Sequence, residues 1–217
     1  MSLIKTKKKG SLIIVSGPSG SGKDTICNKV LNNNPNMHIS ISCTTRSIRD
    51  KEIDGVNYYF KSKSEFEDMI RNNEFIEYAI YNDNYYGTLK KEVEDRLNNG
   101  IDVILVIEVQ GALKVREIYP DAIFIFIVPP SMKELKNRLV NRNTEDSEKI
   151  FKRLKTAYKE INEISNYNYV VVNDEIELAV KKIESIILVD KLRTDKIEEV
   201  FVDNIEEIMH EALIEKN

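Results

Sequence analysis

A glycine-rich loop lies directly between a short apolar run and a segment of helical character, and it restricts the fold more than any other feature of this chain. In such a loop the glycines let successive backbone N–H groups turn toward an anion, the helix N-terminus adds its positive end, and a lysine supplies a cation. We therefore predict a phosphate-binding loop between a buried strand and a helix. The residues expected to contact the phosphates are Gly17, Pro18, Ser19, Gly20, Ser21, Gly22, Lys23, Asp24 and Thr25.

The residue after the lysine departs from the usual form of this loop. Asp24 stands where a hydroxyl is common, and the hydroxyl follows one place later, at Thr25. Mg²⁺ often keeps several waters and is held mostly by nucleotide phosphates, so one imperfect protein ligand is enough. Thr25 is the candidate protein ligand of Mg²⁺, acting through the phosphates and water, and the alternative role for Asp24 is to cap the helix.

The apolar runs predict an α/β fold with a parallel sheet. They are nearly continuous rather than alternating, as in strands that helices cover on both faces. The runs are Leu12–Ser16, residues 103–107, Ile123–Val128 and Tyr169–Val172. Between them, Ser62 with Glu65 and Ser131 with Glu134 have capping-box spacing, and Asn99-Gly100 has the form of a helix stop. With 217 residues, 41% of them hydrophobic, the chain is suited to one such core.

Charge, cysteine content and the pattern near the N-terminus argue against a nucleic-acid-binding protein, a disulfide or zinc framework, and a membrane segment. The net charge of -4 argues against binding nucleic acid without sequence preference. Cys27 and Cys43 are far apart and form neither a CxxC pair nor a Cys/His cluster, which favours a reducing cytoplasm over a disulfide framework or a zinc site. The apolar stretch after Lys5, Lys7, Lys8 and Lys9 is too short for a membrane or signal segment. His38 and His210 lie outside every motif.

A series of further motifs follows along the chain. They are Ser42-Cys-Thr-Thr-Arg46-Ser-Ile-Arg49, Asp54-Gly55-Val-Asn-Tyr58, Phe75-Ile-Glu77-Tyr78, Asn84-Tyr-Tyr86-Gly87-Thr88, Glu108-Val-Gln-Gly111, Pro129-Pro-Ser, Arg138-Leu-x-x-Arg142-x-Thr144 and Val-Val-Asn173-Asp174. Over roughly residues 11–185, the chain resembles the guanylate kinases, a family of nucleoside monophosphate kinases. The resemblance implies a P-loop NTPase-type three-layer core with a parallel sheet, an inserted small mixed or antiparallel GMP-binding subdomain, and a helical lid. It also implies Mg²⁺-dependent transfer of a phosphoryl group from ATP to GMP, and possibly to dGMP.

The acceptor site can also be argued from its chemistry. Arg46 and Arg49 can grip one phosphate, and Tyr58 and Tyr86 can donate hydrogen bonds to it. A carboxylate such as Glu77 offers two acceptors to the adjacent N1–H and N2–H₂ donors of guanine, while a hydroxyl of Ser42 or Thr88 can donate to O6. Packing of the tyrosines and solvation of the arginines are the alternatives. The GMP contacts implied are Ser42, Arg46, Arg49, Tyr58, Glu77, Tyr86, Gly87, Thr88, Glu108 and Gly111.

The segment after Pro129-Pro130, with its cationic side chains, resembles the mobile lid of the family. Arginines brought in by closure can stabilise the charge that spreads over the transferred phosphoryl group. The catalytic residues implied are Lys23, Arg46, Arg138, Arg142 and Arg153. Asn173 and Asp174 resemble the adenine contacts of the family, and Arg138 is a further implied ATP contact. The alternative role for Asp174 is to cap the next helix. The resemblance also implies that Glu108, which follows a strand, contacts guanine or, through water, Mg²⁺.

The predicted organisation follows from these assignments. The divisions are a core of residues 11–41, 89–137 and 154–186, a GMP-binding subdomain of residues 42–88, a lid of residues 138–153, and an extension of residues 187–217. Apolar residues from Ile197 to Leu213 keep helical spacing, so we expect an amphipathic helix in a monomer or homodimer. Two rival functions remain, a phosphoprotein-binding module of the same fold and a kinase of another small phosphomonoester. A switch GTPase is disfavoured because the chain has no Asn-Lys-x-Asp motif.

Overall fold

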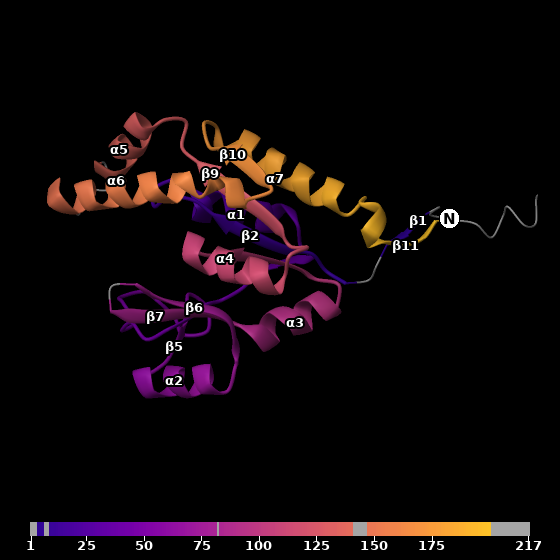
Figure 1. Ribbon diagram of the computed structural model, residues 1–217, viewed down its shortest axis with the longest axis horizontal. Helices are drawn as coiled ribbons and strands as arrows, with labels where there is room; N and C mark the ends of the chain where they lie inside the picture. Colours follow the sequence, from indigo (N-terminus) through magenta and orange to yellow (C-terminus); the bar gives the residue numbers. More distant parts are fainter. Residues whose placement is uncertain (1–3, 7–8, 82, 141–146, 201–217) are drawn as a thin grey trace, which may run out of the picture.

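The computed structural model describes residues 4–6, 9–81, 83–140 and 147–200. Helices cover a parallel sheet on both faces, a second sheet lies beside them, and a two-stranded ribbon extends from one end (Figure 1). The strands are β1 Ile4–Thr6, β2 Leu12–Ser16, β3 Met37–Ile39, β4 Cys43–Thr44, β5 Tyr59–Phe60, β6 Phe75–Tyr81, β7 Asn84–Leu89, β8 Asp102–Val106, β9 Ile123–Val128, β10 Tyr169–Val172 and β11 Ile197–Val200. The helices are α1 Lys23–Asn33, α2 Lys63–Arg71, α3 Lys90–Asn98, α4 Val109–Ile118, α5 Met132–Val140, α6 Ser147–Asn162, α7 Ile176–Asp190 and the 3₁₀ turns Ile164–Asn166 and Thr194–Lys196.

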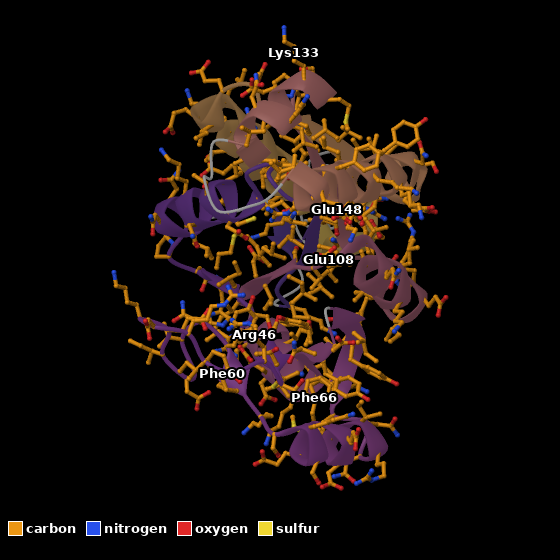
Figure 2. The ribbon with its side chains drawn as sticks, turned by 90° about the vertical axis from the view of Figure 1, so that its left-hand side faces the viewer. Arg46, Phe60, Phe66, Glu108, Lys133 and Glu148 are labelled. Carbon is orange, nitrogen blue, oxygen red and sulfur yellow. The ribbon has the colours of Figure 1, made fainter. Side chains whose placement is uncertain are left out.

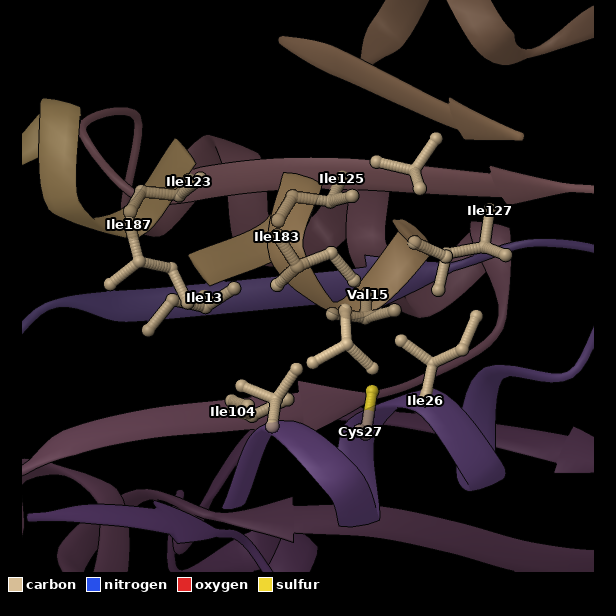
Figure 3. Close-up of a cluster of buried hydrophobic side chains, with 14 residues drawn as sticks. Ile13, Val15, Ile26, Cys27, Ile104, Ile123, Ile125, Ile127, Ile183 and Ile187 are labelled. Carbon is tan, nitrogen blue, oxygen red and sulfur yellow. The ribbon is translucent and has the colours of Figure 1, made fainter. Parts of the chain in front are cut away.

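The large sheet has the order β10-β9-β2-β8-β3, and all its strands run parallel. Strand β2, which leads into the glycine-rich loop, lies at the centre. Side chains alternate across a strand, so Ile13 and Val15 face α1 and α7, whereas Leu12 and Ile14 face α3 and α4. Figure 3 shows the first of these two clusters, in which isoleucines of β2, β8 and β9 meet Cys27 of α1 and Ile183 of α7. The parallel α/β fold predicted from the four apolar runs is confirmed.

The second sheet has the order β5-β4-β7-β6. It is mixed, because β4 runs parallel to β5 but antiparallel to β7. Helix α2 covers one face, where Phe66 stacks on Phe75 and Tyr85 with ring centroids 4.4 Å and 5.1 Å apart. The predicted capping box at Ser62 and Glu65 is present at the start of this helix. The face away from α2 is turned toward α4 and the parallel sheet (Figure 1).

Both ends of the described chain meet in the ribbon, where β1 pairs antiparallel with β11. Residues Ile197–Val200 are therefore a strand, and the amphipathic helix predicted to start at Ile197 is wrong for these residues because the N-terminal strand provides a hydrogen-bonding partner. The rest of the predicted helix, residues 201–217, lies outside the described residues. Among the helices of the described segments, none has the length and apolar character needed to cross a membrane.

Candidate functional site

The candidate site forms where the parallel strands end. The carboxyl ends of parallel strands share one edge of a sheet, and ligands of open α/β sheets bind there. At this edge β2 leads into the glycine-rich loop, β8 leads to Glu108, and β10 leads to Asn173. Residues that are distant in sequence therefore meet around one loop.

The glycine-rich loop has the conformation that anion binding requires. Gly17, Gly20 and Gly22 have φ values of 147°, 91° and 93°, a region that favours glycine. Gly22 is the N-cap of α1, so no side chain covers the N–H groups of its first turn. Asp24 lies inside that turn, so the alternative role of Asp24 as the helix cap is wrong. The Lys23 ammonium donates to the carbonyl oxygens of Gly17 and Pro18, and so remains within the loop.

Asn173, predicted to contact ATP, and Arg153, predicted to be catalytic, hold the glycine-rich loop from outside, and Arg138 in turn holds Asn173. The buried Asn173 amide donates to the Ser21 carbonyl at 2.7 Å, and a Cβ on Gly22 would lie 2.3 Å from the same amide. Arg138 donates to the Asn173 carbonyl at 3.1 Å, and Arg153 donates to the Ser19 hydroxyl at 2.9 Å. Asp174 accepts from the Glu175 backbone N–H. The N-cap position of α7 is Glu175, whose side chain makes no capping hydrogen bond, so the alternative role of Asp174 as the cap of this helix is wrong. Arg142 lies outside the described residues.

The residues predicted to bind the acceptor phosphate gather beside the second sheet around Arg46, which follows β4 and which Figure 2 shows below Glu108. Its guanidinium lies over the rings of Tyr58 and Phe60, at 5.4 Å and 5.7 Å from their centroids, and it also hydrogen-bonds Tyr86. The Tyr58 and Tyr86 rings meet edge to face at 6.0 Å. One cation and two phenols are thus held together, as a phosphate site requires.

Glu52, which no sequence motif indicated, fixes this arginine. Its carboxylate accepts from Arg46 at 2.8 Å and 3.1 Å, and from the backbone N–H of Arg49 at 2.9 Å. The hydrogen bond from Arg46, followed by that from Arg49, lowers the pKa of Glu52, so the pair persists at neutral pH and is lost only in acid. The Arg49 side chain is exposed, and its phosphate contact stays a prediction.

We expect Glu52→Ala to raise KM for GMP roughly tenfold, because a freed Arg46 no longer holds one orientation. Steady-state kinetics at fixed saturating ATP measure this. Asp50→Ala is the matched control, since Asp50 is an exposed acid of the same loop. Equal KM values for the two variants would show that Glu52 does not orient the arginine.

Glu77 is the buried carboxylate of the site. It is 7% exposed, and the Thr88 hydroxyl donates to it at 2.7 Å from the neighbouring strand β7. Burial raises the pKa of Glu77, and the Thr88 hydrogen bond opposes this shift. On the other side a Cβ on Gly111 of α4 would stand 2.7 Å from the carboxylate, so only glycine leaves room for it. Thr88, predicted to donate to the guanine O6, here orients Glu77.

A single cleft of about 340 Å³ joins the glycine-rich loop to the residues predicted to bind the acceptor phosphate and guanine. Its lining from the glycine-rich loop and α1 is Ser19, Gly20, Gly22, Lys23, Asp24 and Thr25. Its lining from the second sheet and its connections is Ser42, Tyr58, Glu77, Ala79, Tyr86 and Gly87, and from β8 and α4 it is Val106, Ile107, Glu108 and Gly111. Neither Arg46 nor Arg49 is among these lining residues, and Arg46 contacts Tyr58 and Tyr86, which are. An anion on Lys23 and one at the tyrosines would therefore occupy the same cleft.

A second residue that no sequence motif indicated is Glu160 of α6, whose pKa is raised by burial and then by hydrogen bonding with Glu108 and its charge. Arg153 and Glu160 are seven residues apart and share one face of that helix. The seven-residue spacing from Arg153, a predicted catalytic residue, was the signal in the sequence that could have indicated Glu160 as a residue of the site.

Comparisons with known proteins agree over nearly the whole chain. The sequence model described as guanylate kinase matches residues 9–189. A guanylate kinase of Clostridium tetani is 54% identical over 206 residues, which cover 95% of this chain and 99% of that protein. One of Clostridium perfringens is 51% identical over 213 residues, 98% of this chain and 99% of its own, so the alignment includes most of the segment beyond residue 189. The crystal structure of guanylate kinase from Anaplasma phagocytophilum has a TM-score of 0.74 at 35% identity, covering 91% of this chain and 93% of that one.

Proposed function

The chain belongs to the guanylate kinase family and is an ATP:GMP phosphotransferase, and from this premise we propose how its residues carry out the transfer. The γ-phosphoryl group passes directly, in line, from ATP on the glycine-rich loop to the phosphate of GMP on the second sheet. The observation that carries this proposal is the one cleft lined by both Lys23 and the Tyr58–Tyr86 pair.

On the donor side, the backbone N–H groups of residues 17–22 cradle the phosphates, and Lys23 binds the β and γ oxygens. The Lys23 ammonium rests on loop carbonyls, so it needs only a side-chain rotation to reach a phosphate. Arg138 and Arg153 already reach Asn173 and the loop, and we assign them, with Arg142, to the lid of residues 138–153. Closure of this lid brings positive charge to the transferred group and excludes water that would hydrolyse ATP.

On the acceptor side, Arg46, Arg49, Tyr58 and Tyr86 bind the phosphate of GMP. The acceptor oxygen belongs to a phosphate whose second pKa is about 6, so it is already largely anionic at neutral pH and needs no general base. Glu77 accepts from guanine N1–H and N2–H₂, with support from Ser42, Gly87, Thr88, Glu108 and Gly111.

The residues at the mouth of the loop fit a magnesium ion that comes with ATP. Thr25 and Asp24 both line the cleft, and the buried Ser21 hydroxyl has no hydrogen-bond partner among the described residues. Such a small set of oxygen donors suits Mg²⁺, which keeps several waters and binds substrate phosphates. When bound, the ion neutralises charge on the β and γ phosphates, and Thr25 would be its protein ligand.

We further infer a cytoplasmic enzyme of purine nucleotide metabolism that acts as a monomer or homodimer, with dGMP as a second acceptor. Two free, buried cysteines are compatible with a reducing compartment. Burial raises the pKa of both the Cys27 and the Cys43 thiol to about 12, which keeps them unreactive.

An ADP-release assay with purified protein and Mg·ATP tests the assignment of the acceptor. We expect turnover with GMP, slower turnover with dGMP, and kcat/KM values lower by orders of magnitude for AMP, UMP and CMP. Equal rates for all bases would contradict the role of Glu77. Binding of GMP without ADP release would instead favour a binding module.

A further inference from the structure

Lys114 of α4 reaches from the core to the second sheet. Its ammonium donates to the backbone carbonyl of Tyr78 at 2.6 Å, and it lies 5.0 Å from the centroid of the Tyr78 ring. Tyr78 directly follows Glu77 in β6. A lysine of the core thus holds the residue next to the buried carboxylate of the site.

The Tyr78 carbonyl is open to such a donor because β6 is at the edge of its sheet. The order β5-β4-β7-β6 gives β6 one neighbouring strand, β7, within the described sheet. In an antiparallel pair, alternate residues turn their backbone N–H and C=O groups away from the partner strand. On an edge strand these groups have no further strand to bond to, and Lys114 satisfies one of them. The hydrogen bond from Lys114 therefore ties the outer edge of the second sheet to α4.

Two residues of α4 hold two consecutive residues of β6. Gly111 and Lys114 are three positions apart, so they lie on one face of the helix. Gly111 stands against Glu77, since a Cβ there would lie 2.7 Å from the carboxylate, whereas Lys114 binds Tyr78. The glycine lets the helix and the strand approach closely, and the lysine supplies an attraction across the same contact. Lys114 thus holds β6 at the place where the Glu77 carboxylate meets α4.

The charge of Lys114 acts on the same carboxylate. Burial raises the pKa of Glu77, and the Thr88 hydrogen bond and then the charge of Lys114 oppose this shift. The ionised form of Glu77 is the one that offers acceptors and no donor to guanine. The lysine therefore favours both the position and the ionisation state of Glu77 that recognition of guanine requires.

We propose that Lys114 is a positioning residue for guanine recognition: by tying β6 to α4, it fixes the Glu77 carboxylate in the cleft. This inference rests on the proposed function. Without the contact, β6 is freer to move away from α4, and Glu77 spends less time in the orientation that matches the N1–H and N2–H₂ donors of guanine. GMP then binds more weakly and is less well distinguished from AMP, while binding of ATP to the glycine-rich loop is unaffected.

Three substitutions of Lys114 separate the parts of this contact. Lys114→Ala removes it entirely, Lys114→Met keeps the apolar stem without the donor or the charge, and Lys114→Arg keeps a cation that can donate to a carbonyl and stack on a ring. All three new residues favour a helix, so α4 should remain intact. Lys133→Ala is the matched control, because Lys133 is an exposed lysine of α5 at the opposite end of the molecule from the second sheet (Figure 2).

We expect Lys114→Ala and Lys114→Met to raise KM for GMP roughly fivefold and to lower the ratio of kcat/KM for GMP to that for AMP roughly threefold. KM for ATP should stay nearly unchanged, and Lys114→Arg should behave like the unaltered protein. Steady-state kinetics with each nucleotide measure these values, and thermal melts show whether each variant is folded. A lower melting temperature with an unchanged base ratio would assign Lys114 to stability alone and contradict the proposal.

Combination with Glu77→Gln tests whether Lys114 acts through Glu77. If it does, Lys114→Ala should change the ratio for GMP over AMP only slightly once Glu77 has been replaced, so the effects of the two substitutions should not add.

Two further results would overturn the proposal. One is an unchanged KM for GMP in Lys114→Ala, and the other is the same fold-change in the base ratio with and without Glu77→Gln. Both leave the phosphotransferase activity of the unaltered protein intact. Absence of GMP turnover in the unaltered protein would instead contradict the proposed function.

Discussion

Replacing Lys23 with methionine is expected to lower kcat by about 10²–10³-fold, the largest effect of any single change in this site. Methionine keeps most of the apolar stem and removes only the cation that binds the β and γ oxygens. That charge matters most when negative charge spreads over the transferred group, so kcat should fall more than KM rises.

The measurement is the ADP-release assay at saturating GMP and ATP. Lys29→Met is the control on the same helix, where Lys29 pairs with Glu177 on the surface. Because the Lys23 ammonium also donates to Gly17 and Pro18, a thermal melt and a GMP titration of each variant must show that the cleft is preserved. A loss of less than tenfold in the folded variant would remove Lys23 from the chemistry.

Replacing Glu77 with glutamine is expected to lower kcat/KM for GMP about a hundredfold and to narrow the preference for GMP over AMP. The carboxylate presents two acceptors to guanine, whereas the amide presents one acceptor and one donor, which opposes an N–H of the base. Because Glu77 is buried, water cannot readily satisfy the mismatched group.

The ratio of kcat/KM for GMP to that for AMP measures this effect directly. Glu74→Gln provides the control, since Glu74 lies just before the same strand but is exposed. A ratio that stays at the value of the unaltered protein would assign base selection to another group, and Glu108 would be the next to test.

Local sequence patterns were sufficient to predict the structure wherever it depends on residues that are close together in the chain. The strand–loop–helix unit around Gly17 to Lys23 was predictable because apolar continuity, glycine conformation and the helix start all lie within a short window. The same holds for the capping box at Ser62, whose two hydrogen bonds join residues three apart. Strand β3 was missed because Met37–Ile39 is short and has no distinctive pattern of its own.

Elsewhere, contacts between residues that are distant in the sequence decided the structure. Ile197–Val200 has helical spacing, but β1 recruits it into a ribbon from the other end of the chain. Asn173 was expected to contact adenine, and that role stays a prediction. Its bond to the Ser21 carbonyl shows that it also supports the glycine-rich loop, across a separation of 152 residues.

The sequence alone determined which chemistry this protein has, because phosphate cradling and base matching are properties of residue types at fixed short spacings. Only the tertiary structure decided how those residues are held. Glu52 orients Arg46, Thr88 and Gly111 frame Glu77, and Lys114 holds Tyr78. The physical reason is that a hydrogen bond or a close packing contact depends on distances of a few ångströms between side chains, which the fold sets and no local pattern encodes.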